Sequence, residues 1–307
     1  MKSGFVVILG RPNVGKSTLL NALVGSKISI VTPKPQTTRD AIQGVLTRPE
    51  GQIVFVDSPG IHEPSLELGR HMMSEVRRAT AGCHLVLLVV DVTAPEQEGD
   101  LTALHMLKDT KLPVMLLMNK VDLLRSKEEL LPQIDRYRQR HDFLEIVPLA
   151  ARTSMNLELL VKLIYEHLPE SPPFYGEDYL TDQPERFLAA ELIREQIIFE
   201  TQQEIPYATA VVIDNWQEER GLLRLAATVF VERQSQKAIM IGAGGKKMKK
   251  IGTQARKQME ARFNRKVFLE LFVKVKPKWR HHPGFIRSLD FHRMAAHDAI
   301  DAEVDNV

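Results

Sequence analysis

The segment GRPNVGKS at residues 10–17 constrains this chain more than any other feature. An apolar run at 5–9 precedes it and a helical pattern at 17–24 follows it, which is the context that a phosphate-binding G-x-x-x-x-G-K-S/T loop requires. Such a loop surrounds phosphates with backbone N–H groups, while Lys16 reaches the β- and γ-phosphates and the Ser17 hydroxyl binds Mg²⁺. The alternative is a chance glycine-rich turn between a strand and a helix. The flanking elements favour a nucleoside triphosphate site.

Two further motifs indicate which nucleotide binds. Residues 57–60, DSPG, end an apolar run, where Asp57 would hold Mg²⁺ through water and the Gly60 N–H would donate to a γ-phosphate. Residues 119–122, NKVD, end another, and the Asp122 carboxylate can accept two hydrogen bonds that guanine offers and adenine does not. Alone, the first is a common turn and the second is equally well a helix cap. Three motifs in order, each at the carboxyl end of a predicted parallel strand, indicate GTP rather than ATP.

Apolar strands alternate with helical patterns through the first half of the chain, which predicts an α/β P-loop GTPase domain with a mostly parallel sheet flanked by helices. Proline, glycine and aspartate then form a stiff polar linker. Beyond it a helix, two strands, a glycine-rich turn, a helix and a strand predict an α+β module. We expect a GTP-binding domain at 1–170, a linker at 171–184, the second domain at 185–293 and an acidic, disordered tail at 294–307.

The near-neutral net charge of +2 conceals a local excess of positive charge. Residues 233–280 hold 15 basic and 2 acidic side chains, whereas residues 171–232 hold 4 basic and 12 acidic ones. Such a concentration is the electrostatic footprint of a polyanion-binding surface.

The remaining composition excludes several classes of protein. The single cysteine, Cys83, rules out an internal disulfide framework and Cys-rich zinc sites, and we expect it to be a buried thiol. The longest apolar run is far shorter than the ~20 residues that span a bilayer. Because the chain runs directly into a predicted strand, we also expect no signal peptide.

A G-x-x-G turn lies inside the basic segment. Residues 241–247, IGAGGKK, connect an apolar stretch to a lysine-rich helix expected at 246–263. A turn without Cβ atoms lets a nucleic-acid backbone approach while lysines hold its phosphates, which is how KH domains clamp about four single-stranded nucleotides. A lone G-x-x-G is a weak signal, and a solvated basic helix is the alternative. The charge and the order of elements favour a prokaryotic, type II KH domain.

Eleven residues are candidates for RNA contact. They are Ile241, Gly242, Ala243, Gly244, Gly245, Lys246, Lys247, Lys249, Lys250, Arg256 and Trp279. For Trp279, base stacking and an anchoring role against the last strand remain equally open. His281, His282 and His292 are spaced too loosely for a metal site.

With these motifs the chain resembles the Era-like GTPases, a translation-factor-related family with a C-terminal type II KH domain. The resemblance spans nearly the whole chain and includes QTTR at 36–39. It implies GTP hydrolysis, with Thr38 of switch I contacting Mg²⁺ and the γ-phosphate. It also makes Asn13 a candidate K⁺ ligand that would neutralise charge developing on the phosphate, the alternative being that Asn13 only supports the loop.

Two positions depart from related enzymes. Ile61 follows the DSPG glycine where Ras-like enzymes carry a water-orienting Gln, so we expect slow intrinsic hydrolysis. His62 is better interpreted as a solvent-facing histidine than as a base. In the base-binding loop LAAR, Ala150 replaces the serine of the family. The Ala151 N–H could still reach guanine, but we expect weaker nucleotide affinity.

The resemblance and the motifs together give the following residue assignments. The expected catalytic residues are Lys16, Thr38, Gly60 and Asn13, and the expected Mg²⁺ ligands are Ser17, Thr38 and, through water, Asp57. The expected nucleotide-binding residues are Gly10, Arg11, Pro12, Asn13, Val14, Gly15, Lys16, Ser17, Thr18, Asp57, Ser58, Pro59, Gly60, Asn119, Lys120, Asp122, Ala150 and Ala151.

The resemblance further implies a GTP-driven switch that binds the 3′ end of 16S ribosomal RNA and assists maturation of the 30S subunit, as a cytoplasmic monomer with some peripheral membrane association. Two alternatives stay open. The basic helix could dock a regulatory GTPase on anionic lipid, although lipid needs no G-x-x-G clamp. The chain could also be an RNA chaperone with vestigial nucleotide turnover, against which the intact Lys16, Ser17, Asp57 and Asp122 argue.

Overall fold

The computed structural model describes residues 1–62, 64–108 and 110–289, so the predicted tail at 294–307 and His292 lie outside the described residues. The chain folds into two compact units. The first comprises Met1–Ser65 and Gly69–Asp182, and the main part of the second begins at Gln183. Among the described residues, no helix combines the length and the apolar character needed to cross a membrane.

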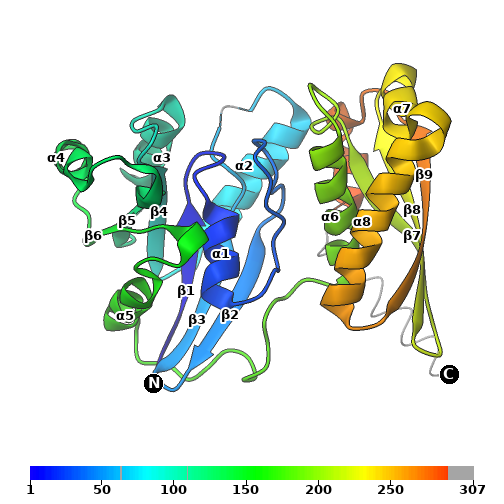
Figure 1. The fold of residues 1–307 in the computed structure, drawn as a ribbon. Helices are drawn as coiled ribbons and strands as arrows, with labels where there is room; N and C mark the ends of the chain where they lie inside the picture. Colours follow the sequence, from blue (N-terminus) through cyan, green and yellow to red (C-terminus); the bar gives the residue numbers. More distant parts are fainter. Residues whose placement is uncertain (63, 109, 290–307) are drawn as a thin grey trace. The chain divides into compact units, whose positions relative to one another are not determined.

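A six-stranded sheet forms the centre of the first unit (Figure 1). Its strand order is β2-β3-β1-β4-β5-β6, and β2 alone among these strands runs antiparallel to its neighbour. This is the mostly parallel P-loop architecture that the sequence predicts. The strands are β1 Lys2–Leu9, β2 Ile42–Arg48, β3 Gly51–Asp57, β4 Leu85–Asp91, β5 Val114–Asn119 and β6 Glu145–Pro148.

Helices cover both faces of this sheet. One face carries α1 and α5, and the other carries α2, α3 and α4. Consecutive strand residues such as Val6 and Val7 belong to different cores, which explains why the central strands read as continuous apolar runs. The helices are α1 Lys16–Val24, α2 Glu67–Thr80, α3 Glu98–Lys108, α4 Leu130–Arg138 and α5 Leu157–His167.

The three predicted motifs stand at the carboxyl ends of parallel strands. Residues 10–17 follow β1, residues 57–60 begin at the last residue of β3, and residues 119–122 begin at the last residue of β5. Strand β1 pairs with β3 and β4, and β4 pairs with β5. The sheet therefore brings the motifs to one edge.

The second unit is built on a three-stranded sheet, β7-β8-β9. Strands β7 and β8 are antiparallel, and β8 and β9 are parallel. Helices α6 and α8 pack together and against this sheet (Figure 1). The elements are α6 Glu185–Glu200, β7 Ala210–Glu219, β8 Leu222–Val231, α7 Gln234–Ile241, α8 Lys246–Phe263, β9 Lys266–Val275 and α9 Pro283–Ser288.

Helix α7 is absent from the sequence-based expectation, which places an apolar stretch directly before the glycine-rich turn. Its N-cap position is Arg233, not a residue that normally caps a helix. The cap is instead made by Gln236, whose Oε1 accepts from the N–H groups of Glu232 and Arg233 at 2.9 and 3.1 Å. The usual start signal is therefore missing from the sequence.

Most of the expected linker lies against the first unit. Val45 N donates to Leu180 O at 2.9 Å, and Thr181 Oγ1 donates to Gln43 O at 2.7 Å. Asp182 Oδ1 accepts from Gln43 N at 3.3 Å. These bonds run along β2, an edge strand whose backbone groups would otherwise face solvent. The domain limits themselves stay a prediction.

Candidate functional site

The loop at residues 10–17 folds around its lysine. Lys16 is buried, and its Nζ donates to Gly10 O at 2.9 Å and Arg11 O at 3.0 Å. Burial lowers the pKa of Lys16 to about 8, partly opposed by the charge of Asp57. Gly15 has a φ of 103°, and a Cβ there would lie 2.3 Å from Asn119 Nδ2. Both the backbone conformation and the close approach require glycine.

Three oxygen-bearing side chains meet beside the lysine. Ser17 Oγ donates to Asp57 Oδ2 at 2.7 Å and lies 2.9 Å from Thr38 Oγ1. Asp57 Oδ1 is buried without a hydrogen-bond partner among the described residues. Burial also raises the pKa of Asp57 to about 6, against the charge of Lys16. Hard oxygen donors with an unsatisfied carboxylate oxygen fit a Mg²⁺ ion, so the residues suit the expected metal.

The glycine of DSPG packs directly on the phosphate loop. A Cβ on Gly60 would lie 2.7 Å from Pro12 N, so only glycine fits. Ile61 is buried and its N–H donates to Gly10 O at 3.1 Å. Its side chain therefore fills the core instead of facing solvent. His62 is half-buried, with Nδ1 2.8 Å from Gly60 O.

The NKVD motif joins the phosphate loop to the base-binding loop. Asn119 Nδ2 donates to Val14 O at 2.7 Å, and Lys120 Nζ donates to Asn13 O at 2.8 Å. Asp122 is exposed. The Ala151 N–H donates to Asn119 Oδ1 at 3.0 Å, and its contact with guanine stays a prediction.

A groove in the second unit borders the G-x-x-G turn at Gly245. It has a volume of about 800 Å³ and lies between α7, α8 and β9. Its lining combines apolar residues, most of them from β9, with cations from all three elements. The lining residues are Lys237, Ile241, Gly245, Met248, Lys249, Gly252, Thr253, Arg256, Leu269, Leu271, Phe272, Val273 and Lys274. An apolar floor with a basic rim suits unstacked bases joined by phosphates.

Comparison with known proteins identifies both units. A family model described as "50S ribosome-binding GTPase" matches residues 5–120, and a KH domain model matches residues 204–280. GTPase Era of Heliobacterium modesticaldum is 46% identical over 292 residues, 95% of this chain and 97% of that protein. The chain belongs to the GTPase Era family. GTPase Era of Syntrophus aciditrophicus is likewise 46% identical, with 94% of this chain and 95% of that protein covered.

Solved Era structures share the whole fold. A crystal structure of Era in complex with MgGDPNP and nucleotides 1506–1542 of 16S ribosomal RNA has a TM-score of 0.92 and 39% identity, over 95% of this chain and 99% of that one. An Aquifex aeolicus Era variant bound to GDP and AlF₄⁻ gives 0.90 and 38% over the same shares. Family membership and the phosphate loop establish that this Era-family chain is a GTPase with a C-terminal KH domain.

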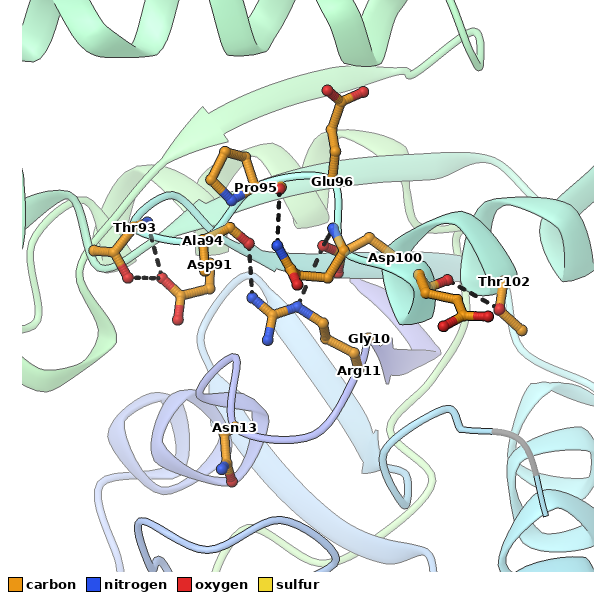
Figure 2. Close-up of polar contacts among 12 residues, drawn as sticks. Gly10, Arg11, Asn13, Asp91, Thr93, Ala94, Pro95, Glu96, Asp100 and Thr102 are labelled. Carbon is orange, nitrogen blue, oxygen red and sulfur yellow. Dashed lines mark hydrogen bonds and ion pairs between the residues drawn. The ribbon is translucent and has the colours of Figure 1, made fainter. Parts of the chain in front are cut away.

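Two candidate contact residues have side chains that bind other parts of this Era-family structure. Trp279, a candidate for base stacking, is completely buried, and its Nε1 donates to Ala208 O at 2.9 Å. It is an anchor of the KH unit and offers no face to a base. The Arg11 side chain binds Asp100 and Ala94 O (Figure 2), so a contact of this residue with the nucleotide stays a prediction for its backbone.

The other RNA candidates lie at or near the groove, with different partners. Lys249 and Arg256 line it, whereas Lys246 and Lys247 begin α8 beside the turn. Lys250 is held by Glu200 at 2.8 Å, and Arg256 by Glu260 at 3.0 Å. A half-buried acid would compete with RNA for each of these two cations.

Sequence reasoning missed several residues at these sites. Asp91 pairs with Lys120 at 2.5 Å, and its position at the end of a fully apolar strand is a signal that could have found it. Asp100 on α3 had no such signal. Phe272 belongs to the groove lining and is 52% exposed. Along its face of β9 it alternates with polar residues, and this pattern is a signal that could have found an exposed aromatic side chain.

Proposed function

We propose that this chain is a GTP-controlled RNA-binding factor that recognises the single-stranded 3′ end of 16S ribosomal RNA and assists assembly of the 30S subunit. The observation that carries the proposal is the apolar groove with a G-x-x-G turn and a basic rim, on the same chain as a complete GTP site. A related Era, 39% identical, was crystallised with nucleotides 1506–1542 of that RNA.

Magnesium fits the nucleotide site of this chain. Ser17 and Thr38 would bind the ion directly, and Asp57 would hold it through water. When bound, the ion neutralises charge on the β- and γ-phosphates. Lys16 would then exchange its two loop carbonyls for phosphate oxygens, and the Gly60 N–H would meet the γ-phosphate.

We also propose that Asn13 is a ligand of K⁺. Asn13 Nδ2 donates to Pro33 O at 3.0 Å, which turns Oδ1 into the atom of this amide that can ligate a cation. A monovalent ion there would supply positive charge near the phosphate loop, where Ile61 offers none. We therefore expect hydrolysis to be slow and faster in K⁺ than in Na⁺.

The switch would act through the nucleotide state. GTP orders switch I through Thr38 and the DSPG loop through Gly60, and we expect RNA affinity to differ between the GTP-analogue and GDP forms. Equal RNA affinity in both forms would refute this coupling. We propose a monomer that acts in the cytoplasm.

The decisive experiment is a titration of the pyrimidine-rich 3′-terminal 16S sequence into the GTP-analogue complex at physiological salt. A scrambled RNA of equal length and composition is the control. Charge alone gives Kd values of ~10⁻⁴–10⁻⁶ M for both RNAs. We expect at least a hundredfold preference for the ribosomal sequence. Equal weak binding would overturn base recognition, and binding to anionic vesicles would then be measured, because α8 carries enough lysine to support peripheral membrane association.

A further inference from the structure

Arg11 is the phosphate-loop residue whose side chain points away from the nucleotide. Its Nε lies 3.2 Å from Asp100 Oδ2, and its Nη2 donates to Ala94 O at 2.9 Å (Figure 2). The guanidinium side chain is only 16% exposed, and the Asp100 side chain is 0% exposed. A carboxylate and a guanidinium this deeply buried depend on each other to offset the cost of removing their charges from water.

The local structure around Asp100 is arranged to keep this pair in place. Gln97 N donates to Asp100 Oδ2 at 3.1 Å, which fixes the carboxylate at the start of α3. Gly99 leaves room for the arginine, since a Cβ there would lie 2.8 Å from Arg11 Cβ. Asp100 Oδ1 has no hydrogen-bond partner among the described residues, so Arg11 is the main counterion of a costly buried group.

The same arginine also contacts the phosphate-binding lysine, through its backbone. Arg11 O accepts from Lys16 Nζ at 3.0 Å, while the Arg11 side chain is held by Asp100 of α3 and by Ala94 O. A shift of Arg11 would therefore move the loop backbone and one of the two carbonyls that hold Lys16 ready for the phosphates. It would also release a second cation beside the phosphates.

We propose that Asp100 is a positioning residue for nucleotide binding, which fixes the phosphate loop through the Arg11 side chain. The residue lies outside the three nucleotide-binding motifs. Because every bound nucleotide contacts the phosphate loop, Asp100 should affect the affinity for each of them. The affinities for GDP and for a GTP analogue should therefore change together, and KM should rise with kcat changing less.

The test is Asp100→Asn in the full-length chain, with fluorescent GDP and a GTP analogue as probes and urea unfolding measured in parallel. We expect both Kd values to rise about tenfold or more. The matched control is Glu98→Gln, because Glu98 is exposed in the same helical turn and loses the same charge. Its Kd values should stay within twofold of the parent.

A double-mutant cycle with Arg11→Met tests the route of the effect. The double variant should lose less affinity than the two single losses combined, because no buried charge is left unpaired. Additive losses would overturn the proposal. So would an Asp100→Asn protein that unfolds more readily but binds both nucleotides as the parent does.

A separate variant keeps the test valid if Asp100→Asn does not fold. Arg11→Lys retains the charge but cannot contact Asp100 and Ala94 O together with one planar group. We expect this variant to fold and to bind both nucleotides severalfold more weakly. Unchanged affinity in Arg11→Lys would refute the positioning role.

Discussion

Trp279→Phe separates an anchoring role from an RNA-reading role. The indole is 0% exposed, donates to Ala208 O at 2.9 Å and meets Phe285 edge-on with ring centroids 5.8 Å apart. Phenylalanine keeps most of the packing but leaves a buried carbonyl without its donor, which costs about 1–3 kcal/mol. The smaller ring leaves a cavity that adds about 1 kcal/mol. We expect the KH unit to lose about 2–4 kcal/mol of unfolding free energy.

The assay pairs urea unfolding with RNA titration at urea-free conditions, where the variant stays folded. RNA affinity should remain within about twofold of the parent, because a buried ring has no face for a base. The matched comparison is Phe272→Ala, which removes the exposed ring of a residue in the groove lining. It should barely change stability but weaken RNA binding by about 1–3 kcal/mol. A Trp279→Phe protein of parental stability with tenfold weaker RNA binding would refute this reasoning.

Three further predictions concern the first unit. Gly15→Ala should weaken GTP binding at least tenfold, through strain at φ 103° and the clash with Asn119. The control Gly25→Ala, at φ 74° with open space around its Cβ, should leave nucleotide Kd unchanged. Equal Kd values in both variants would contradict this prediction. Ser17→Ala should raise the Mg²⁺ concentration for half-maximal GTP-analogue binding at least tenfold, and an unaltered Mg²⁺ titration would oppose the assigned ligand set. Burial raises the pKa of Asp182 to about 6, so its stabilising contribution is complete below pH 4 and is lost as pH rises through 6. Asp182→Asn should therefore stabilise the protein at pH 7 by up to about 3 kcal/mol and not at pH 4, as measured by urea unfolding at both pH values, and an equal effect at both would exclude this cause.

The motifs were predictable because they depend on backbone chemistry that sequence spacing records. Gly15 and Gly60 must be glycine, one for a positive φ and both for close approach, and their spacing to Lys16 and Asp57 identifies the loops. The parallel sheet followed from apolar runs that are buried on both faces. Parallel strands then carry separate motifs to one edge, so the composition of the GTP site could be inferred without coordinates.

The direction of individual side chains was not predictable in the same way. Trp279 in a basic segment fits a base-stacking residue as well as an anchor, and only its burial beneath Phe285 decides. Arg11 sits in the phosphate loop, but its partner Asp100 is 89 residues away. Helix α7 lacks a capping residue at its start. Each of these features depends on tertiary contacts, which local pattern does not encode.

The stability of the fold alone does not explain the residues of the nucleotide site. Burial works against the charge of both Lys16 and Asp57, lowering the pKa of the lysine and raising that of the carboxyl. Asp57 Oδ1 adds a buried acceptor without a partner among the described residues. A Mg²⁺–GTP complex carries the opposite charges and the missing bonds. Because it binds the folded chain and not the unfolded one, these costs are offset in the bound state, and the stability of the first unit must rise with nucleotide concentration.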